Sequence, residues 1–355
     1  MHTAQLNKRI DYIDIAKGIG IILVIVGHAF RDEMRIGNPF FEFVYQAVYF
    51  FHMPLFFTVS GLTFGLSYQK YLSTPMQFVK KRIQTQFIPV FSYASLIYIC
   101  FLIAYQIPAV QQALSATGYR LYPFAEYLKL SALEDNPYAV HLWYLWILFI
   151  FSNIAYFCFR YASGGRKTAL LFAAAALILY LFSAFFSLPV ILERLFGNLI
   201  YFAAGILLAS GQQLFSEANP ARSVTVLGWL FMLVYCALYA VEYEFRILNQ
   251  HPVLAFCRLF ANILIIDSVL RVSRKLVNCT PLLYCGRESY PIYLLHQPFC
   301  CGFVGVILYN KLRWPALLVY VLCCVLSILL PAIAVAICRR VKPLGKLTKC
   351  LFNIT

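Results

Sequence analysis

Charged residues are scarce in this sequence of 355 amino acids: they make up 12% of the chain, and only 14 residues are Asp or Glu. Hydrophobic residues make up 62%. Soluble domains contain about 25% charged and about 45–50% apolar residues, so the composition excludes an ordinary soluble protein. It also excludes disorder, which requires low hydrophobicity and high charge. The composition indicates a single integral membrane domain over residues 1–355.

Several well-known catalytic and metal-binding motifs are also missing. The sequence has no GxSxG elbow, no Walker loop and no HExxH pair, so it supports neither a nucleotide-driven pump nor a membrane metalloprotease. None of the twelve cysteines forms a CxxC pair, and most lie in apolar runs. We expect them to pack as small hydrophobic side chains, and neither a disulfide framework nor a metal site is indicated.

Long apolar stretches are abundant, and there are enough of them for ten membrane-spanning helices of about 20 residues each. The sequence therefore predicts an all-α bundle with short connections and no separate soluble catalytic domain. No internal repeat is visible, which weakens the case for an inverted-repeat transporter. The predicted helices cover roughly residues 15–30, 43–66, 87–106, 142–159, 168–187, 191–210, 223–241, 252–270, 289–309 and 316–338.

Basic residues are distributed unevenly between the two ends of the predicted bundle. With the N-terminus in the cytoplasm, the cytoplasmic segments hold 20 of the 29 basic residues and 5 of the 14 acidic residues, so the whole net charge of +15 falls on that face. Cytoplasmic loops of membrane proteins are enriched in Lys and Arg. We therefore expect both termini to be cytoplasmic, and we attribute the positive charge to topology rather than to nucleic acid binding.

The longest predicted outer loop, about residues 107–141, is rich in proline and tyrosine. Two interpretations are open. The loop can fold over a site that faces the outside, or it can lie on the lipid headgroups, where tyrosine is common.

Ionisable groups inside membrane helices are costly, so each is a candidate functional group. Lys17 and His28 in the first helix are 11 residues apart, which corresponds to about 16.5 Å and places them on one helix face. Asp14 lies one turn from Lys17 and can pair with it. It is too far from His28 to orient that ring, so the orienting group must come from another helix. A neutral imidazole is suited to general-base chemistry on a hydroxyl; the alternative is a helix-end histidine bound to a neighbour.

Polar groups in the second and ninth helices are further candidates. His52 and Ser60 flank Pro54, which frees a backbone carbonyl for a ligand or simply kinks a packing helix. Tyr293 and His296 lie in the middle of the ninth helix, where a buried histidine needs hydrogen-bond partners. A purely structural role is the alternative for each of these groups.

The fourth helix begins with His141 and Trp143, and tryptophan at this position is typical of an interfacial anchor. Lys80, Lys81 and Arg82 follow the second helix at the cytoplasmic surface. Such a basic run can bind phosphates, or it can serve as a topology anchor or bind anionic lipid.

In their order and spacing these motifs resemble the acyltransferase-3 family of bacterial membrane O-acyltransferases. The matching pieces are the Lys17-x10-His28 motif within RIDYIDIAKGIGIILVIVGH, HMPLFFTVSG, the KKR run before IP, HLWYL and YPIYLLHQP. The first segment is most similar to the branch that includes fucose O-acetylases. Two positions depart from the family pattern: Leu148 stands where the O-antigen branch usually has glutamate, and Thr85 stands where a further arginine is usual.

The resemblance implies a multi-pass enzyme of the bacterial plasma membrane that transfers an acyl group, most simply acetyl, from cytoplasmic acyl-CoA. The acceptor would be a sugar hydroxyl of a cell-envelope or exported glycan or of a lipid-linked sugar, and envelope-synthesis proteins would be its partners. No metal is required. His28 matches the essential histidine of the family and Lys17 the basic residue of the same motif, with Asp14 beside it. We expect Lys80, Lys81 and Arg82 to bind acyl-CoA, and the acceptor or the acyl oxygen to be oriented by His52, Ser60, His141, Trp143, Tyr293 and His296.

Two other functions are compatible with the sequence. A transporter or flippase of a lipid-linked glycan or acyl compound would move its substrate without consuming CoA. A sensor or scaffold of an envelope-synthesis complex would not bind CoA at all.

Overall fold

The computed structural model describes residues 10–116, 118–133, 135–162, 164–211, 222–241 and 251–354. Every regular element in these ranges is a helix. Among them are ten helices, some built from joined segments, that are long and apolar enough to cross a membrane. The protein is therefore an all-α multi-pass membrane protein, as the sequence predicts.

The N-terminal half of the chain contributes five spans and three short helices. The short helices are α2 (Asp32–Arg35), α6 (Pro108–Ala116) and α7 (Phe124–Leu133). The spans are α1 (Asp11–Ala29); α3 (Pro39–Ser67) with η1 (Tyr68–Tyr71); α4 (Pro75–Arg82) joined by η2 (Ile83–Phe87) to α5 (Ile88–Ala104); η3 (Val140–Leu142) with α8 (Trp143–Tyr161); and α9 (Gly165–Phe185).

The C-terminal half contributes the other five spans. Two shorter helices accompany them, α15 (Thr280–Arg287) and α18 (Lys342–Phe352). The spans are α10 (Val190–Ser210), α12 (Arg222–Val241), α14 (Pro252–Lys275), α16 (Ser289–Leu295) with η4 (His296–Phe303) and η5 (Val306–Lys311), and α17 (Ala316–Arg340).

Each predicted stretch overlaps one span, but two spans differ from the prediction. The third span begins at Pro75 rather than near residue 87, because α4 and η2 continue α5 toward the N-terminus with Lys80 and Lys81 exposed. The ninth is broken at Gln297, whose backbone is extended (φ −124°, ψ 150°). This break lies directly after His296.

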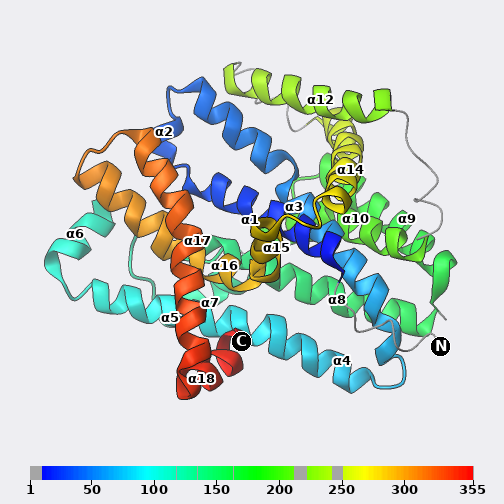
Figure 1. Ribbon diagram of the computed structural model, residues 1–355, viewed down its shortest axis with the longest axis horizontal. Coiled ribbons are helices and arrows are strands. Elements are labelled where there is room, and N and C mark those ends of the chain that lie inside the picture. Colours follow the sequence, from blue (N-terminus) through cyan, green and yellow to red (C-terminus); the bar gives the residue numbers. More distant parts are fainter. Residues whose placement is uncertain are drawn as a thin grey trace.

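The two helices with the strongest functional motifs are the most deeply buried. In the apolar segments of α1 and α3, 61% and 72% of the residues lie inside the structure, compared with 17% in α9 and 22% in α17. Figure 1 shows α1 in the middle of the bundle, with α3 and α15 beside it and α12 at the edge. Side chains at the end of α1 are therefore surrounded by protein rather than by lipid.

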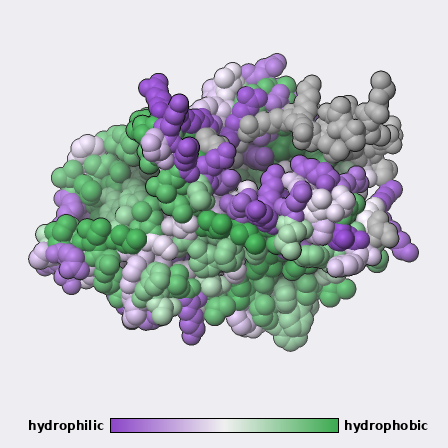
Figure 2. Space-filling model, turned by 90° about the horizontal axis from the view of Figure 1, so that it is seen from below, coloured by the Kyte–Doolittle hydropathy of each residue, from purple (hydrophilic) through white to green (hydrophobic). Residues whose placement is uncertain are grey.

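The outer helices present apolar side chains to the surroundings. Figure 2 shows a broad hydrophobic surface on one face, with hydrophilic residues gathered in separate patches. A lipid bilayer is the environment that such a surface requires. Large exposed apolar side chains include Leu170, Leu171 and Ile178 on α9, Leu227, Leu230 and Val234 on α12, and Leu317, Val321 and Leu329 on α17.

Helix α15 packs tightly against the first half of α1. A Cβ atom on Gly18 would overlap the carbonyl oxygen of Leu282, and a Cβ on Gly286 would overlap the carbonyl oxygen of Asp14. Small residues at such a crossing allow two membrane helices to approach closely. This contact holds the Asp14 turn of α1 in place.

Candidate functional site

His28 lies at the C-terminal end of α1 and is partly exposed to a cavity of about 680 Å³. The cavity, here called the histidine cavity, is walled by the segment after α1 and by α5, α6, η4 and η5. A space of this size accommodates a small-molecule ligand. Its lining includes His28, Phe30, Arg31, Glu33, Phe101, Leu114, Tyr119, Gln297, Cys301 and Lys311.

Described parts of the segment 107–141 line this cavity and pack against α5, while the side of the membrane that the segment faces stays a prediction. Leu114 and Tyr119 line the histidine cavity. The Tyr138 ring stacks on Phe101 with centroids 3.9 Å apart, and the Tyr127 hydroxyl donates to the Ala94 carbonyl at 2.8 Å. The segment therefore forms one wall of the site.

Two more of the predicted histidines lie beside His28. The ring centroid of His296 is 5.3 Å from that of His28 and 5.0 Å from that of His141. His141 and His296 are almost fully buried, and the Tyr293 hydroxyl donates to the carbonyl of His141. Three parts of the chain that are far apart in the sequence, α1, η3 and the α16–η4 region, thus bring three imidazoles and Tyr293 together.

The hydrogen bonds of the two buried histidines determine which ring nitrogen carries the proton. His141 Nε2 is 3.3 Å from the Leu294 carbonyl, and His296 Nδ1 is 2.7 Å from the Tyr293 carbonyl. A carbonyl oxygen only accepts, so these nitrogens donate and the opposite nitrogen of each neutral ring is an acceptor. Among the described residues, neither His141 Nδ1 nor His296 Nε2 has a hydrogen-bond partner. One buried acceptor nitrogen on each ring therefore lacks a donor among the described residues, although neither side chain is part of the lining of the histidine cavity.

Tyr49 of α3 supplies the orienting hydroxyl for His28. Its oxygen lies 3.4 Å from His28 Nδ1. A Cβ on Gly27 would be 2.9 Å from the Tyr49 ring, so glycine at that position makes room for the tyrosine. His52 packs edge-on against Tyr49 with centroids 4.8 Å apart, and its Nδ1 donates to the Val48 carbonyl at 2.8 Å. His52 therefore supports Tyr49, and through it His28.

Tyr49 was not among the residues predicted from the sequence, although an orienting group from another helix was expected. One signal was present: Tyr49 precedes His52 by three residues, which places both on one face of a helix. Its proximity to His28 depends on how α1 and α3 pack.

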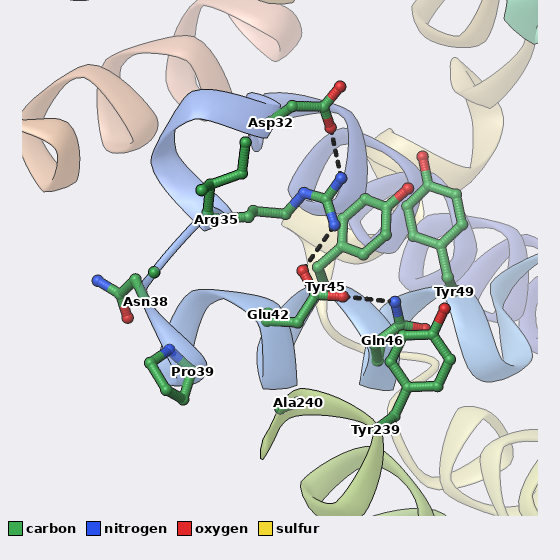
Figure 3. Close-up of a pocket in the computed structure, with 12 residues that line it drawn as sticks. Asp32, Arg35, Asn38, Pro39, Glu42, Tyr45, Gln46, Tyr49, Tyr239 and Ala240 are labelled. Carbon is green, nitrogen blue, oxygen red and sulfur yellow. Dashed lines mark hydrogen bonds and ion pairs between the residues drawn. The ribbon is translucent and has the colours of Figure 1, made fainter. Parts of the chain in front are cut away.

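A second cavity of about 920 Å³ lies beside the first and is here called the arginine cavity (Figure 3). It is formed by α2, the first half of α3 and the end of α12, and Asp32 lines both cavities. Sequence reasoning did not identify it. Its lining consists of Asp32, Arg35, Ile36, Gly37, Asn38, Pro39, Glu42, Tyr45, Gln46, Tyr49, Tyr239 and Ala240.

Arg35 is the centre of a charged network in the arginine cavity. Its guanidinium group donates to Glu42 at 2.7 Å and also to Asp32. It lies 3.7 Å above the centre of the Tyr45 ring. Glu42 also accepts from the Gln46 side-chain amide at 2.7 Å. Figure 3 shows Arg35 held between the two carboxylates, with Tyr45 and Tyr49 side by side.

Two predicted site residues have their principal contacts away from the three histidines. Ser60 shares a 2.8 Å hydrogen bond with the Tyr144 hydroxyl. The Trp143 ring packs 4.7 Å from the guanidinium carbon of Arg194 and 5.9 Å from the Phe57 ring. Ser60 is linked to the site through Tyr144, whose ring is 5.6 Å from that of Tyr293.

The four basic residues predicted as site residues, Lys17, Lys80, Lys81 and Arg82, are not part of the lining of the histidine cavity, which instead includes Arg31 and Lys311. Lys17 pairs with Asp14 at 3.5 Å, as the sequence predicts, and Arg287 of α15 approaches the same carboxylate at 3.9 Å. Eleven residues of helix separate Lys17 from His28 by about 16.5 Å. Lys81 lies 5.9 Å above the Tyr71 ring, and Arg82 lies 4.9 Å above the Phe78 ring. The contacts that the structure gives Lys81 and Arg82 are therefore with aromatic rings of η1 and α4, away from the three histidines.

The family model of an acyltransferase domain matches residues 10–336, nearly the whole chain. The chain belongs to the acyltransferase-3 family. Lys17, His28, His141 and His296 all lie within the matched residues, and the fold brings the three histidines together.

Two curated proteins match part of this acyltransferase-3 chain. Nodulation protein NolL from Mesorhizobium japonicum is 42% identical over 60 residues, which is 16% of each chain. Nodulation protein NolL from Sinorhizobium fredii is 39% identical over 61 residues, which is 17% of each chain. The match spans about a sixth of the length of these relatives. No solved structure matches the chain.

Proposed function

We propose that the protein is a membrane O-acyltransferase that moves an acyl group, most simply acetyl, from cytoplasmic acyl-CoA to a sugar hydroxyl of a cell-envelope or exported glycan. The proposal rests above all on one observation. The imidazole of His28 borders a cavity large enough for reacting groups, while the Tyr49 hydroxyl lies 3.4 Å from its Nδ1. A base held in this way by a second side chain is the usual arrangement for activating a hydroxyl nucleophile.

In the proposed reaction, neutral His28 removes the proton from the acceptor hydroxyl. The oxygen attacks the thioester carbonyl carbon, the C–O bond forms and the C–S bond breaks. Coenzyme A leaves as the thiolate and takes the proton from the His28 imidazolium, so protons and charge balance. General-base catalysis of this kind typically contributes about 10²–10⁴-fold to a rate.

His141 and His296 take the role of acceptor-binding groups in this proposal. Each donates its only proton to a backbone carbonyl, so neither neutral ring can stabilise the developing oxyanion. The nitrogens without partners, His141 Nδ1 and His296 Nε2, are buried in the cluster next to His28, where a water molecule that bridges to the sugar would donate to them. Buried acceptors left without a donor are costly, which favours occupancy by substrate or water.

The donor would approach from the end of the bundle that carries the basic residues. Lys80, Lys81 and Arg82, with Lys17, would bind the phosphates of acyl-CoA as charge-assisted partners. Between this end and the histidines, the Tyr290 hydroxyl of α16 donates to the Thr85 carbonyl of η2 at 3.2 Å. The pantetheine arm would follow this boundary between η2 and α16 toward His28.

The unequal distribution of Lys and Arg supports placing this basic end in the cytoplasm of a bacterium, with both termini there. The two cavities would then open on the outer side, where an exported glycan or a lipid-linked sugar is accessible. The partners would be the envelope-synthesis proteins that deliver this acceptor.

The test compares membranes that contain wild type, His28→Ala or His251→Ala at matched protein levels. Acetyl-CoA labelled on the acetyl group is added, and label is followed into the surface glycan. His251 is exposed at the start of α14, so its removal is a matched control. We expect wild type and His251→Ala to label the glycan and His28→Ala to be at least about a hundredfold slower.

Retained transfer in His28→Ala would refute the assignment of the base. If acetyl-CoA and longer acyl-CoAs stay intact with wild type, and CoA does not protect the purified protein against heat, the transferase proposal fails. Movement of a lipid-linked glycan without CoA consumption would then favour the transporter.

A further inference from the structure

The arginine cavity is larger than the histidine cavity, and the transfer step does not require it. It lies on the other side of the segment that contains Asp32, and Tyr49 connects the two spaces: its ring lines the arginine cavity and its hydroxyl touches His28. A molecule bound in this cavity is therefore separated from the base by a single side chain.

The charges in the arginine cavity do not cancel. Among the described residues that line it, Arg35 is the one cation, and Asp32 and Glu42 are carboxylates. The formal charge of this lining is therefore −1. A carboxylate or phosphate of a ligand brought into this space would be repelled, and an uncharged or amine-bearing ligand would not.

The other lining groups suit a sugar ring. Tyr45 and Tyr49 stack with ring centroids 4.1 Å apart and, with Tyr239, form an aromatic wall. A pyranose has an apolar C–H face that can rest on such a wall and a rim of hydroxyl groups that need donors and acceptors. Gln46 and Asn38 offer both, and the carboxylates offer acceptors.

We propose that the arginine cavity binds a second, non-reacting sugar of the acceptor, and that it selects an uncharged or amine-bearing sugar over an acidic one. This inference rests on the proposed function. The acceptor is then at least a disaccharide: one unit presents its hydroxyl to His28 in the histidine cavity, and its neighbour contacts Arg35, Gln46 and the tyrosines.

The experiment uses the purified full chain in lipid nanodiscs with labelled acetyl-CoA. The probes are neutral disaccharides and matched disaccharides in which one hydroxymethyl group is oxidised to a carboxylate. Each is tested as an acceptor and as an inhibitor of transfer to the glycan, so that binding is measured even when the probe is not acylated. Glucose tests whether one sugar unit is sufficient.

The key variant is Asp32→Asn, which removes one negative charge from a carboxylate that is 81% exposed and leaves Glu42 paired with Arg35. The matched control is Glu126→Gln on α7, which removes a charge outside both cavities. We expect wild type to favour the neutral over the acidic probe by about tenfold. Asp32→Asn should reduce this preference about fivefold through the KM or inhibition constant of the acidic probe, and Glu126→Gln should leave it unchanged.

The inference is overturned if wild type treats neutral and acidic probes alike or prefers acidic ones. It also fails if Asp32→Asn and Glu126→Gln behave identically, or if no disaccharide acts as acceptor or inhibitor although the glycan is acylated. These outcomes leave the proposed function intact, whereas absence of any acyl transfer from intact acyl-CoA removes the proposed function itself.

Discussion

Removing only the hydroxyl group of Tyr49 tests how the structure orients His28. The substitution Tyr49→Phe keeps the ring that stacks on Tyr45 at 4.1 Å and that packs against Gly27. It deletes the oxygen that lies 3.4 Å from His28 Nδ1. The imidazole should stay in place, because helix packing is unchanged, but it loses its hydrogen-bond contact with the Tyr49 hydroxyl of α3.

The expected effect follows from the energy of such a contact. A hydrogen bond contributes about 0.5–1.5 kcal/mol net, and 3.4 Å is longer than the usual range, so the lower half of that interval applies. Because about 1.4 kcal/mol corresponds to a factor of ten, Tyr49→Phe should lower kcat about two- to fivefold. His28→Ala should lower it at least about a hundredfold.

The assay measures initial rates of labelled acetyl transfer against donor and acceptor concentration. Tyr156→Phe is the control: the Tyr156 hydroxyl donates to the Tyr71 carbonyl at 2.6 Å, so this variant also loses one hydrogen bond, but away from His28. An unchanged kcat in Tyr49→Phe would refute the orienting role. A loss beyond a hundredfold would mean that Tyr49 itself transfers the proton.

Three further predictions concern other parts of the protein. Gly286→Ala places a Cβ against the carbonyl oxygen of Asp14, so it should destabilise the fold by about 1–3 kcal/mol; an unchanged Tm in detergent would contradict this packing. Replacing Lys80, Lys81 and Arg82 together by alanine should raise the KM for acyl-CoA about tenfold and make this KM less dependent on salt concentration, with kcat nearly constant. An unaltered KM for acyl-CoA would mean that these three residues do not bind its phosphates. Burial acts to raise the pKa of Glu33, but its backbone hydrogen bond and the Arg31 guanidinium outweigh burial and hold the pKa below its usual value. Because the folded-state pKa is depressed, this stabilisation is present above the usual pKa and is lost as pH falls through the folded pKa. Wild type should therefore lose slightly more Tm on acidification than Glu33→Gln. Parallel plots of Tm against pH for the two proteins would contradict the interaction of Glu33 with Arg31.

Hydropathy was sufficient to identify the ten spans because a bilayer core requires long apolar helices whatever their arrangement. The two errors in the predicted spans, at the third and the ninth, had local causes. The start of the third span was missed because Lys80 and Lys81 interrupt the apolar pattern while α4 and η2 remain helical. The break at Gln297 was missed because apolar residues resume directly after His296, Gln297 and Pro298, so mean hydropathy over the stretch stays high.

The functional residues also divide into those that the sequence predicted and those that only the structure revealed. The sequence by itself determined the membrane class, the ten spans and the candidates His28, His141 and His296, since these depend on composition, on local spacing and on family motifs. The Asp14–Lys17 pair was also predictable, because three residues along a helix make one turn.

Only the tertiary structure decided that these histidines meet, that Trp143 packs against Arg194 instead, and that Tyr49 orients His28. It also placed Arg35 between two carboxylates in a cavity that no motif marks. These relations join residues on different helices, and the spacing of residues along the sequence does not specify which helices meet or at which residues they cross. The crossings are set by close packing of small and aromatic side chains, such as Gly27 against Tyr49, which exists only once the bundle has formed.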